Sequence, residues 1–330
     1  MGVPGAWKLL FERSVKAESC NNLKDILGWR EKKRKIHVDL VGSFYQDIKR
    51  FFIDCDKFDG PQKILAAQKF LNHLAGIIPK DKCVLYVNGS ATEEQSQRIE
   101  KGISNHSKFC RKLEQEIKDY NDKPNKDDWE RLVHRICSMF RFTHDLPTII
   151  YKVASEQGWS IVQAKGEAQV AIGMEGGIVL SGDSDMLFYP NIDTFIKPLI
   201  FGGIHRQEYR LFHKSSVLST LELNSAAFTA MGILSDNEYD RNLYGKPLEH
   251  VYSVIQDIQQ ANPHLFSIRQ FIEAYIAEMN ARTGKSVVLE DYIKSYRIFV
   301  LQEEHLQPVY DAESNNLNTA AHYLKQLRRI

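Results

Sequence analysis

The chain has 330 residues, of which 43 are Lys or Arg and 42 are Asp or Glu, so its formal net charge is +1. This balance excludes a uniformly basic protein that coats nucleic acid or membrane by charge alone, and any site for a polyanion must be local. With 43% hydrophobic and 26% charged residues the composition is that of an ordinary globular protein with a sizeable core.

The first third of the chain alternates short apolar runs with amphipathic stretches. Residues 35–40 form a β run, and the helical spacing of Phe44, Ile48 and Phe52 follows it. A second amphipathic helix is predicted over 62–78, and a second strand over 83–87 ends at the turn signal Asn88-Gly89. Strand, helices and strand in this order indicate a parallel sheet.

The middle of the chain continues this pattern after a polar excursion. Helices are predicted over residues 92–120, 126–142, 146–157 and 167–173. Strands are predicted over residues 159–162, 177–180, 194–201 and 208–213. Beyond residue 215 the pattern is helical, with breaks near 235–247, 261–264 and 311–316. We therefore expect an α/β core over 1–215, with a helical excursion at about 90–145, and an all-helical region over 216–330.

Targeting and redox signals are few. No run approaches the roughly 18 apolar residues of a membrane span, and charges occupy the position where a signal peptide has its apolar segment. The five cysteines are odd in number and form no CxxC pair, so we expect reduced, structural thiols in an intracellular protein without a membrane partner.

Acidic and amide side chains follow the predicted strands. Asp39 ends the first strand, Asn88 follows the second, Glu167 opens a helix, and Asp183 and Asp185 follow a later strand. Ligands of parallel sheets lie outside the carboxyl ends of the strands, so these side chains can converge. Carboxylates without paired His or Cys favour Mg²⁺ or Mn²⁺, one or two ions of which can promote phosphodiester hydrolysis. Taken alone, an Asp-x-Asp pair such as Asp183 and Asp185 is more often part of a turn or a helix cap than of a metal site, and it is the convergence of four such acids that favours the site.

Five ordered motifs resemble those of one family. They are Met1-Gly2-Val3-Pro4-Gly5-Ala6-Trp7-Lys8-Leu9-Leu10, Val38-Asp39-Leu40 with Tyr45-Gln46, Gly166-Glu167-Ala168-Gln169, Ser181-Gly182-Asp183-Ser184-Asp185-Met186-Leu187, and Gly232-Ile233-Leu234-Ser235-Asp236 followed by Tyr239-Asp240-Arg241-Asn242-Leu243-Tyr244-Gly245-Lys246-Pro247. In this order and at this spacing, from residue 1 to about 260, the chain resembles the flap endonuclease/XPG family of structure-specific nucleases. Five motifs together are far more specific than any one of them.

The resemblance implies a PIN-like α/β fold over 1–215, made of an N-terminal region (1–105), a helical arch (about 90–145) and an internal region (about 146–215). A helix-two-turn-helix element that grips duplex DNA is implied at about 224–260. The positions that match the family's metal and catalytic carboxylates are Asp39, Glu167, Asp183, Asp185 and Asp236.

Nucleic-acid contacts are also implied by the resemblance. Tyr45 matches a residue that stacks on a base, and Gly2 matches a buried N-terminal position beside the DNA. In the arch, Gln95 stands where the family has a basic residue, and Arg98 and Lys101 are the replacements one turn on. Gly245 and Lys246 match the turn of the helix-two-turn-helix element, which lacks its usual first glycine.

Two departures fall in the implied metal site. Asn88 and Lys165 stand where the family has acids, both on the side of the ion that generates the attacking hydroxide. Five carboxylates and one lysine still leave a charge of about −4, which attracts divalent cations. A protonated Lys165 cannot bind a metal, and its charge could instead replace one by pairing with Asp39 or Glu167.

Basic residues concentrate near the start of the sequence. Residues 1–36 hold nine Lys or Arg against four acids, a local charge of +5. The run Lys32 to Lys35 is either a phosphate-contacting or nuclear-targeting patch or a solvated loop before a strand. We expect a nuclear protein, in keeping with the DNA repair role that the resemblance implies.

Three functions follow from these observations. The leading hypothesis is a Mg²⁺- or Mn²⁺-dependent nuclease that hydrolyses branched or single-strand-bearing DNA. The second is a pseudonuclease that binds nucleic acid or a protein partner without cleaving it. The third is a PIN-type nuclease directed at RNA, which would use the same carboxylates.

Overall fold

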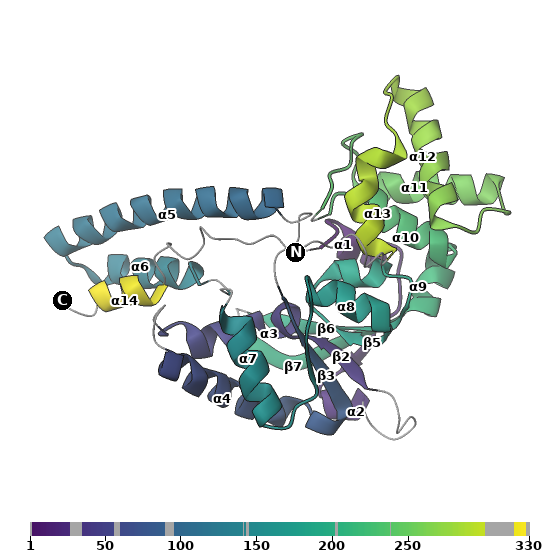
Figure 1. The fold of residues 1–330 in the computed structure, drawn as a ribbon. Helices are drawn as coiled ribbons and strands as arrows, with labels where there is room; N and C mark the ends of the chain where they lie inside the picture. The colour runs from purple at the N-terminus through teal and green to yellow at the C-terminus, as the bar shows by residue number, and fades with distance from the viewer. Residues whose placement is uncertain are drawn as a thin grey trace.

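The computed structural model describes residues 2–26, 35–55, 60–89, 96–140, 142, 145–201, 204–237, 239–300 and 320–327. Within them a seven-stranded sheet has the strand order β1-β7-β6-β5-β2-β3-β4 (Figure 1). The strands are β1 (Glu18–Cys20), β2 (Ile36–Asp39), β3 (Cys83–Val87), β4 (Ile161–Gln163), β5 (Gly177–Leu180), β6 (Ile192–Phe201) and β7 (Ile204–His213).

The predicted parallel sheet is confirmed for the centre. Strand β2 pairs in parallel with β3 and β5, β3 with β4, and β5 with β6. The edge differs, because β7 pairs antiparallel with both β6 and β1. The connection between β6 and β7 is too short for a parallel crossover, so these two extended runs form a hairpin.

One face of the sheet is covered by α3 (Leu40–Phe52), α4 (Gly60–Ile77) and α7 (Asp145–Glu156). Phe44, Ile48 and Phe52 recur at helical spacing on the buried side of α3 and pack in the same apolar cluster as Val38 and Leu85 of the sheet. The short α2 (Leu23–Ile26) and η1 (Lys80–Lys82) complete this side of the chain.

The opposite face carries more helices. They are α1 (Ala6–Glu12), α8 (Ala168–Glu175), η3 (Ser184–Phe188), α9 (Lys214–Leu221), α10 (Ser225–Leu234), α11 (Leu248–Ala261), α12 (Ile268–Thr283), η4 (Leu289–Tyr292) and α13 (Ile293–Phe299). A single apolar cluster joins Val179 and Phe195 of the sheet to Phe228, Phe271 and Tyr292 of these helices. The helical region beyond residue 215 therefore shares its core with the sheet, which fixes its position beside the carboxyl edge.

A helical hairpin leaves the sheet between β3 and α7. It consists of α5 (Ser96–Asp122) and α6 (Lys126–Ser138), and α14 (Ala320–Leu327) lies beside it (Figure 1). The hairpin turns at the predicted break, where Asn125 accepts a hydrogen bond from the Asp128 N–H at 2.8 Å and caps α6. Because β3 ends at the carboxyl edge and α7 begins there, the hairpin is rooted at that edge.

No single helix of the described residues is long and apolar enough to cross a membrane; only α9 and α10 taken together, across an 83° bend, reach the required length and composition.

Candidate active site

Four of the predicted acids lie at the carboxyl edge of the sheet. Asp39 is the last residue of β2, Glu167 precedes α8 in the segment after β4, and Asp183 and Asp185 follow β5. Their exposed fractions are 3%, 7%, 6% and 0%, respectively. Carboxylates are seldom buried unless they are paired or bind a ligand, so four at one edge mark a candidate site.

Hydrogen bonds orient two of these carboxylates. Asp39 Oδ1 accepts from the Gly42 N–H at 2.9 Å, which also caps α3, and Oδ2 accepts from Ser181 Oγ at 2.8 Å. Asp183 Oδ2 accepts from Gln169 Nε2 at 2.9 Å. Ser181 Oγ in turn accepts from the Asp183 N–H at 3.1 Å. Ser181 therefore connects the end of β2 to the loop after β5, and each carboxylate oxygen keeps lone pairs for a further ligand.

Asp185 differs from its neighbours. Neither of its carboxylate oxygens has a hydrogen-bond partner among the described residues, although the side chain is fully buried. Desolvation raises the pKa of this carboxyl group well above its usual range, and the charges of Asp183 and Glu167 raise it further. The nearby Val3 N–H offsets a part of this rise. A buried carboxylate beside two others, with only the Val3 N–H as a nearby donor, is the arrangement that a bound cation would stabilise.

Desolvation also raises the pKa of Asp39 and is the largest influence on it. The hydrogen bonds from Gly42 and Ser181 lower this pKa, and the charge of Asp183 raises it further. Both shifts have the same physical origin, which is that negative charge is concentrated in a volume from which water is largely excluded.

Glu167 is held by a tyrosine from the C-terminal helical region. Tyr239 Oη donates a hydrogen bond to Glu167 Oε2 at 2.7 Å, and the Tyr239 ring is buried. Burial raises the pKa of Tyr239 well above its usual value, and the charge of Glu167 adds to it, so the phenol remains a donor at neutral pH. Tyr239 thereby connects the loop after α10 to the carboxylate at the start of α8.

The start of the chain lies against the acids. A Cβ atom added at Gly2, whose φ is +126°, would come within 2.3 Å of Asp183 Oδ1 and of Ser184 Oγ. Ser184 Oγ also donates to the Val3 carbonyl at 3.3 Å. Gly2 is therefore in contact with the acid group, and a side chain there would displace Asp183.

Asn88 has a structural role at this edge. Its Oδ1 accepts a hydrogen bond from the Ala168 N–H at 2.9 Å and so caps α8 from the end of a neighbouring strand. Glu167, the residue before α8, makes no side-chain cap bond of its own. The amide oxygen that could have bound a metal is thus engaged with the helix, although its second lone pair remains.

Lys165 occupies an exposed position in the segment after β4. Its side chain is exposed, and in the described part of the chain no ion pair connects it to Asp39 or Glu167. Its backbone carbonyl lies beside Gly89, since a Cβ at Gly89 would come within 2.8 Å of it. Lys165 is therefore a solvent-facing cation at the rim of the site and does not replace a metal ion by pairing with these two carboxylates.

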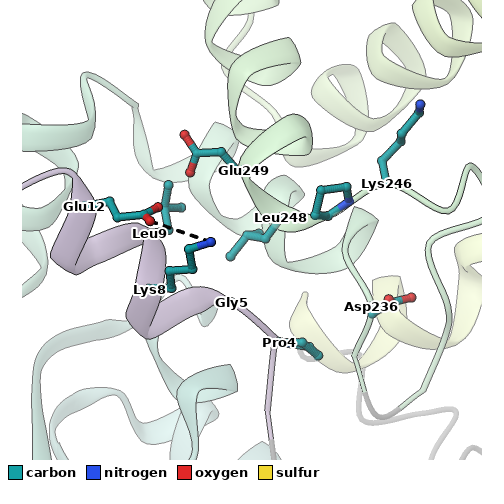
Figure 2. Close-up of a pocket in the computed structure, with 10 residues that line it drawn as sticks. Pro4, Gly5, Lys8, Leu9, Glu12, Asp236, Lys246, Leu248 and Glu249 are labelled. Atoms are coloured by element: carbon teal, nitrogen blue, oxygen red, sulfur yellow. Dashed lines mark ion pairs between the residues drawn. The ribbon is translucent and has the colours of Figure 1, made fainter.

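Asp236 differs from the four buried acids in its exposure and its hydrogen-bond partner. It is exposed, its Oδ1 accepts from the Asn242 N–H at 2.7 Å, and no hydrogen bond or ion pair joins it to the buried acids within the described residues. It lines a pocket between α1 and the start of α11, together with Lys8, Glu12 and Lys246 (Figure 2). None of the four buried acids lines this pocket.

The turn before α11 is organised by a buried asparagine. Asn242 Oδ1 accepts from the backbone N–H groups of Tyr244 and Lys246 at 2.9 and 3.2 Å, and its Nδ2 donates to the Leu234 carbonyl at 2.9 Å. Gly245 has a φ of +64°, a conformation that glycine adopts without strain. The turn is therefore well defined without the glycine that the motif lacks, and it presents the half-buried Lys246 beside the pocket.

The remaining predicted residues belong to α3 and to α5 of the hairpin. Tyr45 is half-buried, and its hydroxyl donates to the Phe140 carbonyl at 2.7 Å, which ties α3 to the segment after α6. Arg98 and Lys101 lie in the first turns of α5, but their side chains fall outside the described residues, as does Gln95.

The types of the buried side chains suit a metal ion, but their arrangement in this structure does not form a metal site. The donor set consists of carboxylate oxygens, which suit a hard cation, and the orphaned Asp185 carboxylate fits a missing positive charge. Among the residues that the structure describes, however, no group of three or more His, Cys, Asp or Glu side chains is arranged to hold a metal ion. The carboxylates thus suit a hard cation by their chemistry, but they do not converge on one point in this structure. Gln169, Ser181 and Tyr239 donate hydrogen bonds to three of them.

Comparisons with known proteins support the fold. No family model and no curated protein matches this sequence. The catalytic core of Rad2 in complex with DNA substrate is similar in structure, with a TM-score of 0.50 and 12% identity, over 99% of this chain and 94% of that one. This chain has the PIN-like fold of the flap endonuclease/XPG nucleases.

Two further solved structures are similar over long stretches. Human GEN1 in complex with Holliday junction DNA has a TM-score of 0.47 and 15% identity, over 99% of this chain and 72% of that one. Flap endonuclease-1 from Methanococcus jannaschii has a TM-score of 0.43 and 13% identity, over 88% of this chain and 98% of that one.

Sequence reasoning missed the residues that support the acids in this flap endonuclease/XPG fold. Ser181 and Gln169 belong to recognised motifs, yet their hydrogen bonds to Asp39 and Asp183 depend on which loops meet at the edge. Tyr239 lies three residues after Asp236, so the motif pointed to its neighbourhood but not to its contact with Glu167.

Proposed function

We propose that this protein is a divalent-metal-dependent, structure-specific nuclease that hydrolyses phosphodiester bonds in branched or single-strand-bearing DNA. The observation that carries the proposal is the group of buried carboxylates at the carboxyl edge, of which Asp185 has no hydrogen-bond donor among the described residues. Support also comes from the shared fold with the Rad2 core, whose structure contains DNA substrate.

In this proposal Asp39, Glu167, Asp183 and Asp185 hold the cation. A divalent cation bound there supplies positive charge that stabilises the phosphate and lowers the pKa of the attacking water. The attacking water would lose a proton to solvent as its oxygen forms a bond to phosphorus, the bond from phosphorus to the leaving oxygen would break, and the leaving oxygen would take up a proton from solvent. Gln169 and Ser181 fix the rotamers of Asp183 and Asp39, and Tyr239 fixes Glu167. Asp236 is left outside this group because it is exposed and engaged with Asn242.

The DNA is proposed to lie over the same edge. Gly2 brings the backbone of the chain within contact distance of Asp183, so that a phosphate can approach the acids without a side chain in the way. Tyr45, Arg98 and Lys101 are proposed to contact the single-stranded part, and Gly245 and Lys246 the duplex. The exposed Lys165, two residues before Glu167, is suited to neutralise a phosphate at the rim.

The pseudonuclease alternative depends on a different feature. In its specific form, the ammonium of Lys165 replaces a metal ion within about 4 Å of Asp39 or Glu167. The exposed Lys165 does not form that contact, which favours the enzyme. The engagement of Asn88 with α8 favours a weakened site, because one potential ligand is already in use.

The test is cleavage of an end-labelled 5′-flap duplex with Mg²⁺ or Mn²⁺, with single-stranded DNA, plain duplex and single-stranded RNA as further substrates. The matched variants are Asp183→Asn in the site and Asp257→Asn, which removes an exposed carboxylate of α11. The proposal predicts metal-dependent cleavage of the flap that Asp183→Asn abolishes and Asp257→Asn retains. Binding without cleavage above the Asp183→Asn level identifies a pseudonuclease, and faster cleavage of RNA than of any DNA identifies an RNA-directed enzyme.

A double variant tests the two departures from the family. Asn88→Asp keeps an oxygen that can cap α8 and adds a carboxylate, and Lys165→Glu converts the rim cation to an acid. If these residues weaken an active site, the double variant gains activity at low Mg²⁺ concentration. A loss of activity on Lys165→Glu alone would instead assign Lys165 to phosphate binding.

A further inference from the structure

The helical hairpin has an apolar core of its own. A third cluster, separate from the two that flank the sheet, is formed by three helices that are far apart in the sequence. Its buried members are Cys110, Leu113 and Ile117 of α5, Leu132, Ile136 and Met139 in and just after α6, and Ala320, Tyr323, Leu324 and Leu327 of α14. Four of its ten buried members therefore come from the last described helix of the chain.

The spacing of these residues is that of three packed helices. The buried residues of α14 recur at intervals of three and four, while His322, Lys325 and Gln326 on its other side are exposed. Leu113 and Ile117 of α5 and Leu132 and Ile136 of α6 show the same interval. Each helix thus contributes one apolar stripe to the cluster, and α14 lies beside α6 in the hairpin (Figure 1).

Polar contacts fix the three helices in register. Tyr323 Oη of α14 donates to Glu114 Oε1 of α5 at 2.9 Å. Arg135 of α6 pairs with Glu116 of α5, and its guanidinium lies 5.3 Å from the centre of the Phe109 ring. Ile53, at the end of α3, is the residue that packs against both this cluster and the core below the sheet. Among the described residues, Ile53 is therefore the apolar link between the three-helix unit and the core below the sheet.

Neither part of this unit is expected to be stable alone. An isolated helix of eight residues is far below the roughly 12–15 residues at which even good helix formers become marginally stable in water. Two helices that expose an apolar stripe also need a third layer to cover it. The fold of the hairpin and the fold of α14 thus depend on one another.

We propose that α14 is an intramolecular strap that keeps the α5–α6 hairpin folded, and that its release unfolds the hairpin while the sheet stays intact. The hairpin is rooted at the carboxyl edge beside the buried acids, so the strap couples the last helix of the chain to the approach to the site. This inference rests on the packing of described residues and is independent of whether the protein cleaves nucleic acid.

Hydrogen exchange of the full-length protein, followed by mass spectrometry, tests the proposal. The double variant Leu324→Asp, Leu327→Asp places two charges in the cluster, and Gln326→Asp places one on the exposed side of α14 as the matched control. For the double variant we expect exchange in residues 104–138 to rise by about 30-fold or more, because each substitution removes a buried leucine. Exchange in β2 and β5 stays at its wild-type rate, and the Gln326→Asp protein is unchanged throughout.

A milder variant guards against general unfolding. Tyr323→Phe removes only the hydroxyl that donates to Glu114, and we expect a rise of about fivefold in exchange that is confined to the hairpin and α14. Unchanged exchange in residues 104–138 of the double variant would overturn the proposal, because the hairpin would then be stable without the strap. An equal rise in the hairpin and in β2 and β5 would overturn it as well, because α14 would then belong to the global core.

Discussion

Asp185→Asn is expected to stabilise the protein in the absence of divalent cations. The Asp185 carboxylate is fully buried, has no hydrogen-bond donor among the described residues, and lies near the charges of Asp183 and Glu167. Replacement of such a buried charge by a neutral group of similar volume is expected to contribute about 1–4 kcal/mol of stability. The asparagine can also donate a hydrogen bond to a neighbouring carboxylate.

This free energy converts to a measurable shift in melting temperature. An unfolding entropy of about 2.1 cal/mol/K per residue, over 330 residues, gives a shift of about 1.4 °C for each kcal/mol. The metal-free variant should therefore melt about 1.5–6 °C above the wild type. The assay is thermal denaturation in a chelator, with Asp257→Asn as the control for loss of an exposed carboxylate.

Added cation should reverse the order. At 100 times its dissociation constant, a ligand specific for the folded state contributes about 2.7 kcal/mol, or roughly 4 °C here. Wild type should gain this amount with Mn²⁺, and Asp185→Asn should gain less than half of it. A variant that is destabilised in the chelator would refute the reasoning, because Asp185 would then have a partner that stabilises its charge.

The raised pKa of Asp185 also predicts that the stability of the metal-free protein depends on pH. The pKa of Asp185 is raised in the folded state, so the folded protein binds a proton that the unfolded chain has already lost. The stability of the metal-free wild type therefore falls as the pH rises from about 4, the usual carboxyl pKa, to the raised value. Asp185→Asn should show a smaller fall, and Asp39 accounts for part of what remains.

Three further predictions concern residues around the site. Tyr239→Phe removes the donor to Glu167 and should lower metal-dependent cleavage by about tenfold or more, since such bonds contribute about 1.5–3 kcal/mol; Tyr151→Phe, at an exposed tyrosine, should change it less than twofold. Gly89→Ala should destabilise the protein by about 1–3 kcal/mol in urea titrations, because its Cβ would lie 1.8 Å from the Ala164 carbonyl oxygen, whereas Gly76→Ala, in open space on α4, should not. Burial lowers the pKa of Lys214 to about 8, against about 10.4 in the unfolded chain. Burial of the charged lysine therefore lowers the free energy of unfolding by up to about 3 kcal/mol below pH 8, and this destabilisation disappears as the pH rises to about 10.4. Lys214→Met should thus be the more stable protein at pH 7 and lose this advantage by pH 10; a constant difference in urea titrations at both pH values would contradict the shift.

Local pattern predicted most elements of this fold, and it failed where tertiary contacts decide. The strand over 83–87 and the hairpin break at 121–125 follow from apolar runs and turn residues. The antiparallel edge follows from how β6 returns through β7, which periodicity does not encode. The short α1 was not predicted, because a helix of seven residues with three buried apolar positions, Ala6, Leu9 and Leu10, is too short to show a period.

The site shows the same division. Burial of Asp39, Glu167, Asp183 and Asp185 at one edge agrees with the expectation from their positions after strands. The exposure of the Lys165 side chain could not be predicted, because a residue in a bend has no regular period that separates buried from exposed positions. The hydrogen bond from the Ala168 N–H to Asn88 joins two segments 80 residues apart, so it could not be predicted from local sequence. It shows that the asparagine at position 88 caps α8.

The central claim is that the buried carboxylates bind a divalent cation. Titration of the metal-free protein with Mn²⁺, by calorimetry, tests it without reference to any substrate, and Asp183→Asn and Asp257→Asn are the site and surface variants. We expect at least one saturable Mn²⁺ site in the wild type and in Asp257→Asn, and its loss in Asp183→Asn. An equal Mn²⁺ titration for all three proteins, or none in the wild type, would contradict it.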